Sequence, residues 1–399
     1  MIQTKRALYD SFAYFIATIF FLILFFGHTL AYFNSPNVSS GFVLSIVETI
    51  YLLKKVFLFI SFVCVFFRKK VSIASIITVF VVVSIVLFTY VVSPEQANLF
   101  TDIYLDFFCG ITFYLLLVGG TIQIERLMPI AIFVGRVLLI FCLLSIFTQA
   151  DWEYFISRNY MFFSNAFLAP IAVLIYAIYK KGNWLDYGLV ILGILVVLLY
   201  GSRGDFLVLS LLAVIMLYLK IKKKNILLLL LLIPIIIAGI FILINSGILA
   251  GSSSRTIEKI FSGEFFNSAG RFEIWGYLIS RSFSNALIGR GLCADRLYLM
   301  ERLQSGEQVY AHNFFIEVLV DFGIIGLMAS VFVVVILVRF IHKCCNNEKK
   351  NVIIMLSCVS FFPLMFSRTF LAEPGFFMML GVILNWRLTY KNEGEKEHR

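Results

Sequence analysis

Apolar residues occur along the chain in long blocks, and short polar segments that carry most of the charge separate these blocks. Each block approaches the ~20 helical residues needed to cross a ~30 Å hydrocarbon core. The pattern predicts an all-α, polytopic membrane protein whose residues 1–399 form a single membrane domain. About twelve transmembrane helices are expected, at residues 11–33, 41–67, 71–92, 99–119, 127–148, 164–179, 185–200, 206–219, 226–246, 313–340, 352–366 and 375–390.

One long polar segment, residues 247–311, precedes the tenth predicted helix. Within it, residues 271–282 have the pattern of an amphipathic helix that lies in the membrane interface. Trp275 and Tyr277 would anchor this helix at the level of the lipid headgroups, because tryptophan and tyrosine side chains favour that layer. We therefore expect residues 247–311 to form an external, or periplasmic, loop that contains an interfacial helix.

Composition supports the membrane assignment. Of the 399 residues, 61% are hydrophobic and 14% are charged, whereas soluble domains carry about a quarter charged residues. The seven cysteines form no CxxC pair, and we interpret them as structural. The net charge of +10 does not require a nucleic-acid partner, because the basic residues follow the membrane topology.

Lysine and arginine residues are concentrated in every second polar segment. Short segments on the opposite side hold only Arg158, Arg203 and Arg368. Because basic residues accumulate in cytoplasmic loops, both termini are predicted to be cytoplasmic. Lys54, Lys55 and Arg136 fall inside predicted helices, where a charge is costly and indicates a functional site or a paired acid. The candidate partners are Glu48, Asp102 and Asp106.

The basic residues of the external face are nearly all arginine, whose planar fork can bind phosphate through two parallel hydrogen bonds. Arg203 lies in Gly201-Ser202-Arg203-Gly204-Asp205, between two predicted helices. The next helix begins there, and free N–H groups at a helix N-terminus attract anions. A snorkelling arginine at the interface would have the same pattern.

Arg271 and Trp275 lie four residues apart in Gly270-Arg271-Phe272-Glu273-Ile274-Trp275, on one face of the predicted interfacial helix. This depth suits a phosphate group, although simple surface anchoring would produce the same spacing. His312, in Tyr310-Ala311-His312-Asn313, is the one external histidine outside a predicted helix. It is a candidate general base that titrates near neutral pH, and a helix-capping histidine is the alternative.

Glu317 and Asp321 follow His312 with helical spacing, and Asp102 and Asp106 repeat that spacing in the fourth predicted helix. We expect these four acids to line a polar interior. The chain contains no DxD, GxxxxGK[ST], HExxH or GxSxG motif. Chemistry at an outward-facing site would need a substrate that is already activated and delivered in the membrane. No metal and no cofactor is expected.

The ordered motifs resemble the O-antigen polymerase and O-antigen ligase superfamily of bacterial envelope enzymes. The similarity covers mainly residues 190–330, from Ser202-Arg203-Gly204 through Gly270-Arg271 and Gly289-Arg290-Gly291 to Ala311-His312-Asn313. It implies a GT-C-like membrane glycosyltransferase in the bacterial inner (plasma) membrane. Its donor would be an undecaprenyl-pyrophosphate-linked oligosaccharide, and a chain-length regulator would be a further partner.

The same resemblance implies roles for individual residues. Arg203 and Arg271 would bind the donor pyrophosphate, and His312 would orient or deprotonate the attacking sugar hydroxyl. The other candidates for substrate binding are Arg290, Arg296, Arg368, Asn313 and Trp275.

Three functions remain open at this level. A polymerase, which joins repeat units on the lipid carrier, is favoured because the chain is short and its external loop modest. A ligase would move the finished chain to a lipid A core with the same motifs. A lipid-linked oligosaccharide flippase would place its charges in a central cavity and show two similar halves, and no such halves are visible in the sequence.

Overall fold

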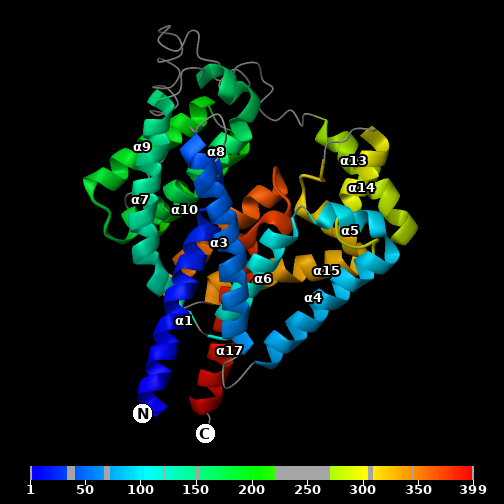
Figure 1. Ribbon diagram of the computed structural model, residues 1–399, viewed down its shortest axis with the longest axis horizontal. Coiled ribbons are helices and arrows are strands. Elements are labelled where there is room, and N and C mark those ends of the chain that lie inside the picture. The colour runs from blue at the N-terminus through cyan, green and yellow to red at the C-terminus, as the bar shows by residue number, and fades with distance from the viewer. Residues whose placement is uncertain are drawn as a thin grey trace. The chain divides into compact units, whose positions relative to one another are not determined.

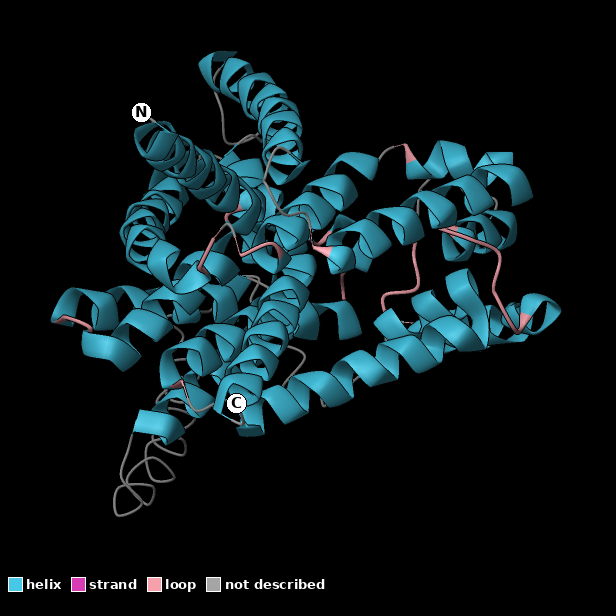
Figure 2. Cartoon of the chain, turned by 90° about the horizontal axis from the view of Figure 1, so that it is seen from below, coloured by secondary structure: helices cyan, strands magenta, loops and turns pink. Residues whose placement is uncertain are grey.

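The structure is a computed structural model, and it describes residues 2–33, 41–66, 72–101, 103–120, 122–148, 152–200, 202–220, 270–303, 309–343 and 346–397. Within these ranges all regular secondary structure is helical, and none of it is strand (Figure 2). The all-α prediction is therefore confirmed for the described residues. The predicted helix at 226–246 and the first part of the external loop lie outside them.

Long helices dominate the described chain (Figure 1). Their bounds are α1 (Ile2–Phe25), α2 (Gly27–Phe33), α3 (Gly41–Phe66), α4 (Ile73–Val92), α5 (Pro94–Phe100), α6 (Tyr104–Val118), α7 (Ile124–Thr148), α8 (Trp152–Lys181), α9 (Trp184–Tyr200), α10 (Arg203–Lys220), α13 (Arg271–Ser282), α14 (Ala294–Leu303), α15 (Phe314–Lys343), α16 (Asn347–Leu356) and α17 (Pro374–Glu397). Short 3-10 helices cover Phe283–Asn285, Phe362–Met365 and Phe370–Ala372, and a π-helix covers Ser357–Phe361.

Four of these helices are long and apolar enough to cross a membrane, or up to six if each of two bent pairs counts as one span. The bent pairs are α1 with α2 and α5 with α6, which correspond to the predicted helices 11–33 and 99–119. The predicted helix 352–366 is not one of the candidates, because the α-helix ends at Leu356 and continues as π- and 3-10-helix. The protein is thus a helical, multi-pass membrane protein, while the count of twelve and the orientation stay predictions.

The described chain divides into two compact units, and the expectation of a single membrane domain stays a prediction. The first unit contains residues 1–27, 44–128 and 267–399. Its closest packing is between α6 and α17, where small residues let the helices approach. A Cβ atom added to Gly110 would come within 2.5 Å of the Phe377 ring, and one added to Gly381 would meet Leu117 at 3.0 Å.

The second unit contains residues 28–43 and 129–266. Its core is α8, which packs against α9 and α10. Gly193 of α9 allows this approach, because a Cβ atom there would lie 2.7 Å from Ile171. Buried hydrogen bonds also connect its parts: Tyr32 and Ser145 share one of 2.9 Å, and the Thr29 hydroxyl donates to the Ala166 carbonyl at 2.6 Å.

Lys54 and Arg136, which were predicted to lie inside helices, form ion pairs. The Lys54 ammonium lies 2.8 Å from Asp106, as one of the proposed pairings anticipated. Arg136 donates twice to Asp186, at 2.7 and 3.0 Å, from a position opposite the first turn of α9. Asp186 was not among the candidate partners of these basic residues, although it lies one residue after the predicted start of that helix. Its carboxylate is fully buried against the arginine.

Helix α15 is broken at Gly323, whose backbone dihedrals are φ 64° and ψ −160°. The segment 286–291 lies along the break and supplies the missing hydrogen bonds. The N–H groups of Ile324 and Ile325 donate to the carbonyls of Ala286 and Leu287, at 2.8 and 3.3 Å. In return, the carbonyls of residues 320 and 321 accept from the N–H groups of residues 290 and 291. In lipid, a broken helix is tolerated where such neighbours satisfy its backbone.

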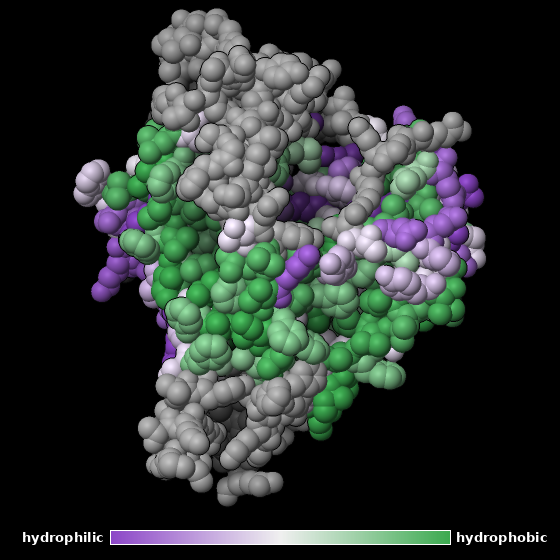
Figure 3. Space-filling view, viewed as in Figure 1, coloured by the Kyte–Doolittle hydropathy of each residue, from purple (hydrophilic) through white to green (hydrophobic). Residues whose placement is uncertain are grey.

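The segment that pairs with α15 is itself apolar on its outer side. Phe283, Leu287 and Ile288 are 74%, 66% and 52% exposed, and Ile324 and Met328 of α15 are also exposed. In Figure 3 hydrophobic colour covers the surface of this unit along α4, while polar residues gather over α13 and α14. These exposed apolar side chains would suit contact with lipid, while the placement of the predicted external loop stays a prediction.

Candidate functional site

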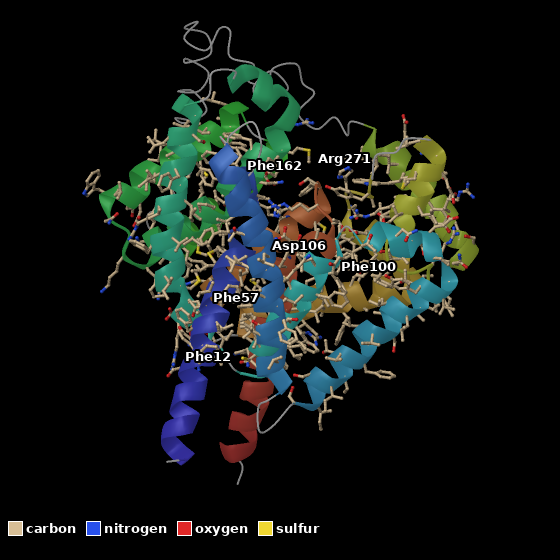
Figure 4. All side chains as sticks on the ribbon, in the orientation of Figure 1. Phe12, Phe57, Phe100, Asp106, Phe162 and Arg271 are labelled. Atoms are coloured by element: carbon tan, nitrogen blue, oxygen red, sulfur yellow. The ribbon has the colours of Figure 1, made fainter. Side chains whose placement is uncertain are left out.

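Helix α13 positions the first candidate, Arg271, in its opening turn (Figure 4). The helix covers Arg271–Ser282, the same residues as the predicted interfacial helix. It follows Gly270, whose φ of 79° lets the chain turn sharply into it. Phe272 is 68% exposed, and Leu278 is buried, so the helix has the expected two faces.

The two aromatic residues predicted to anchor α13 in the headgroup layer bind protein groups instead. The Trp275 indole Nε1–H donates to the Ala311 carbonyl at 2.8 Å. The Tyr277 hydroxyl donates to the Tyr298 carbonyl at 3.2 Å. Both side chains thus connect α13 to neighbouring segments of the same unit, and their position at the headgroup layer stays a prediction. Figure 1 shows α13 and α14 side by side, with α15 passing them.

His312 lies in the turn that precedes α15 and has a left-handed backbone, with φ 53°. Burial lowers the pKa of its imidazole to about 4, and the positive charge of Arg271 adds to this effect. The ring also hydrogen-bonds to the Ser367 backbone, and its Nδ1 has no partner among the described residues. The expectation that His312 titrates near neutral pH is therefore wrong, and the ring is neutral at physiological pH. A neutral imidazole can accept a proton.

Tyr310 and the turn at residues 367–369 complete the surroundings of His312. The Tyr310 hydroxyl donates to the Ser367 carbonyl at 2.5 Å, and its ring lies 4.1 Å from the His312 ring. Thr369, two residues on, donates to Glu317 of α15. The turn at 367–369 is thereby fixed to both the histidine turn and α15.

Three buried carboxylates lie close together: Asp295, Glu317 and Asp321 have oxygen atoms within 4.8 Å of one another. This confirms the polar interior predicted for Glu317 and Asp321. Asp321 accepts from the N–H groups of Cys293 and Ala294, at 3.3 and 2.9 Å, and so caps the start of α14.

Asp295 accepts from the Ala311 N–H at 2.8 Å, and burial raises the pKa of its carboxyl. A metal-free site was expected because the sequence shows no external set of metal ligands. The three clustered carboxylates could form such a set, so that reason does not hold. Four of the six oxygens accept N–H or O–H groups, and Arg296 supplies a positive charge beside them. Asp295 Oδ1 and Glu317 Oε2 have no hydrogen-bond partner among the described residues, so a metal-free site stays a prediction.

The remaining candidates have partners within the protein. Arg368 is 6% exposed, and its guanidinium lies 2.6 Å from Glu373. Arg296 is 4% exposed and stacks 5.6 Å from the Tyr310 ring centre. Arg290 is half-buried and stacks on Tyr298 at 5.3 Å. Of the three, Arg290 has the most accessible side chain, so the structure favours it for a direct phosphate contact and does not favour Arg296 or Arg368.

Asn313 acts as the cap of α15. Its Oδ1 accepts from the N–H groups of Phe315 and Ile316, at 3.1 and 3.3 Å. Capping uses the carbonyl oxygen of the side chain and leaves the amide nitrogen as the group that could contact a substrate.

Arg203 belongs to the second unit, where it opens α10. The preceding Ser202 accepts from the Asp205 N–H at 3.2 Å, and its hydroxyl donates to the Asp205 carboxylate at 2.9 Å. The bond from the Asp205 N–H to Ser202 is an N-terminal cap of the kind that begins many helices. Ser164 of α8 also donates to Asp205, at 2.5 Å. Arg203 is half-buried at the helix N-terminus, as the sequence motif predicts.

Comparison with known proteins bears on this same part of the chain. Residues 188–331 match the family model described as O-antigen ligase. This segment carries the sequence pattern of the O-antigen ligase family. The match confirms the resemblance seen in the ordered motifs, and it contains Arg203, Arg271 and His312. Arg368 and the turn that contacts His312 lie outside the O-antigen ligase segment. No curated protein matches the chain.

Sequence reasoning missed Asp295, Thr369 and Glu373. Asp295 precedes Arg296 in the sequence without a motif of its own, and its role depends on a contact with Ala311 sixteen residues away. Thr369 and Glu373 pair with residues of the histidine site or its turn, and no spacing rule reveals those pairs. The Asp205 contact could have been found, because Ser-x-x-Asp before an apolar run is a capping signal.

Proposed function

We propose that the protein is a bacterial surface-polysaccharide polymerase of the inner membrane. It transfers glycan from an undecaprenyl-pyrophosphate donor to a lipid-linked repeat unit at the periplasmic face. The observation that carries this proposal is that the helix of Arg271 is tied to the histidine turn through the Trp275–Ala311 hydrogen bond, inside the O-antigen ligase segment, so that the arginine charge lowers the pKa of His312. The pair combines a proton acceptor with an anion-binding group beside an amphipathic helix.

The chemistry follows from these two groups. Departure of a pyrophosphate develops negative charge, which a preorganised arginine stabilises, and one such donor typically contributes ~3–4 kcal/mol. The attacking sugar hydroxyl loses a proton, and a neutral His312 can accept it. Arg271 would bind the donor pyrophosphate, with Arg290 as a further contact from the loop before α14. Arg203 is assigned to donor binding by the resemblance and by its place at the start of α10.

Arg296 and Arg368 receive a different role from the one first expected. Since both are buried, we assign them to the electrostatic and structural support of the histidine turn. Trp275 likewise supports Ala311 and is not assigned to substrate. No nucleotide, metal or cofactor is part of the proposal.

The ligase is the second candidate, because the matching family model is described as O-antigen ligase. Gene deletion followed by a gel of surface polysaccharide separates the two. Loss of the ladder with one repeat retained on the core would support the polymerase. Loss of all glycan from the core, with polymer left on the carrier lipid, would support the ligase.

The site itself is tested with matched arginine variants. Arg271→Lys keeps the charge and loses the two-point geometry, so it should slow transfer by roughly a hundredfold, equivalent to ~3 kcal/mol. Arg281→Lys is the control on the same helix, because the Arg281 side chain is exposed and its group stacks on Tyr277. His312→Ala should abolish transfer at normal protein abundance. Full-length polymer from Arg271→Lys or His312→Ala would contradict the site and favour a flippase.

A further inference from the structure

His312 has a backbone conformation that is uncommon for residues other than glycine, although histidine adopts it more often than most. A φ of 53° is in the left-handed region of backbone space, which residues other than glycine rarely adopt. Such a residue persists where the surrounding structure holds it in place, and strained residues of this kind cluster at functional sites. The contacts that hold His312 are therefore the next question.

Both polar groups of Ala311, the residue before His312, bind side chains from other helices. Its N–H donates to Asp295 of α14 at 2.8 Å, and its carbonyl accepts from Trp275 of α13 at 2.8 Å. Ala311 is fully buried, in a cluster with Leu278 and Tyr298. The peptide that leads into the histidine is thus held from two sides.

The two side chains are themselves fixed. Asp295 is fully buried in the first turn of α14, and Asp321 of α15 binds the N–H groups at the start of that turn. The Trp275 ring packs edge-on against Phe272, at 5.3 Å between ring centres. Helices α13, α14 and α15 therefore converge on one peptide, and a shift of any of them would be transmitted to His312.

We infer that Asp295 and Trp275 are positioning residues, which hold the Ala311 peptide so that the His312 ring faces the reacting hydroxyl. The inference rests on the proposed function of His312. It assigns no contact between either residue and the substrate. Both act through backbone hydrogen bonds, so their loss lowers the turnover number and leaves the Michaelis constant for the lipid-linked donor nearly unchanged.

Trp275→Phe is the first test, because it removes the N–H donor and keeps an aromatic ring beside Phe272. It should lower kcat about tenfold, as the loss of one buried hydrogen bond implies. Trp184→Phe is the control, since Trp184 is 85% exposed and makes no part of this turn. Equal kcat in wild type and Trp275→Phe would overturn the inference for Trp275.

Asp295 is tested by rescue. Asp295→Ala removes the acceptor of the Ala311 N–H. Asp295→Asn keeps a side chain of the same size, with a carbonyl oxygen that can still accept this hydrogen bond. Asn should recover most of the kcat that Ala loses. An Asn variant as slow as the Ala variant would show that the carboxylate charge, and not the hydrogen bond, is what matters, and would overturn the positioning role of Asp295.

A readout that does not require activity separates this inference from the proposed function. Diethyl pyrocarbonate modifies neutral imidazole, and peptide mass spectrometry reports His312 and His28 separately. In Trp275→Phe the His312 rate should rise several-fold while the His28 rate stays constant, because only the turn is released. Unchanged modification of His312 would overturn the inference, even if His312→Ala is inactive. If His312→Ala is active, the proposed function fails, and the modification rate still decides whether the turn is held by Trp275.

Discussion

The break in α15 leads to a quantitative prediction about stability, which Gly323→Ala tests. With φ 64° and ψ −160°, Gly323 occupies a region of backbone space that is essentially restricted to glycine. A Cβ atom there would lie 2.5 Å from the Leu287 carbonyl group and 2.6 Å from the Ile288 nitrogen. These neighbours are backbone atoms, so no side-chain rotation relieves the clash.

Two costs contribute to the expected loss. Forcing alanine into this conformation costs about 1–3 kcal/mol. Moving the segment 286–288 away breaks the hydrogen bonds from Ile324 and Ile325, and each such bond is worth about 0.5–1.5 kcal/mol. The sum is about 4 kcal/mol of unfolding free energy, near the upper end of single substitutions.

The assay is the thermal stability of the detergent-solubilised protein, followed by size-exclusion chromatography after heating. Gly323→Ala should lower the apparent Tm by on the order of 5 °C, given the usual scaling with chain length. Gly276→Ala is the matched control in α13, because a Cβ atom there would meet nothing within 4 Å. The control should be neutral or slightly stabilising, since alanine favours helix over glycine. Equal Tm values for the two variants would refute the argument that segment 286–291 and α15 exchange hydrogen bonds.

Three further predictions concern the site and the membrane orientation. Because burial lowers the pKa of His312 to about 4, the transfer rate should not fall on the acid side near pH 6.5. The unfolding free energy should also fall as the pH drops from about 6.5 toward 4, because the histidine of the unfolded chain binds a proton in this range and the folded one does not. A transfer rate that falls at low pH with a midpoint near 6.5 would contradict this. Activity on purified lipid-linked substrate should survive EDTA, because both oxygens of Asp321 and one oxygen of Asp295 already accept backbone N–H groups; recovery only on addition of Mg²⁺ or Mn²⁺ would assign the three carboxylates to a metal. A cysteine at the exposed Ser280 should react with an impermeant maleimide in intact cells and one at Asn347 should not, and the reverse pattern would invert the predicted topology.

The parts of the fold that depend on local pattern were predictable. The interfacial helix has its predicted ends at Arg271 and Ser282, since a glycine with positive φ precedes it and its two faces differ in polarity. The predicted ends of α3 and α4 agree with the structure within two residues. Hydropathy is sufficient to locate these helices because the apolar interior of the membrane favours the apolar stretches that form them.

The features that depend on distant contacts were not predictable. Gly323 lies in an apolar run that has the appearance of an uninterrupted transmembrane helix, and its partner segment lies some thirty residues earlier in the chain. Trp275 has the sequence signature of a headgroup anchor, and only the fold shows that its N–H binds Ala311. The pKa of His312 likewise depends on burial and on Arg271, which spacing alone cannot determine.

The pair between Arg136 and Asp186 has a consequence for how the protein is made. Arg136 lies within α7, whereas Asp186 begins α9 and is synthesised about fifty residues later. An arginine at the centre of an inserting helix costs roughly 2.5–3.5 kcal/mol on translocon-based scales. The apolar residues of α7 offset this cost, since the helix is one of those apolar enough to cross a membrane. Arg136 is therefore without this carboxylate partner from the synthesis of α7 until α9 follows, and the pair is completed late in the synthesis of this unit.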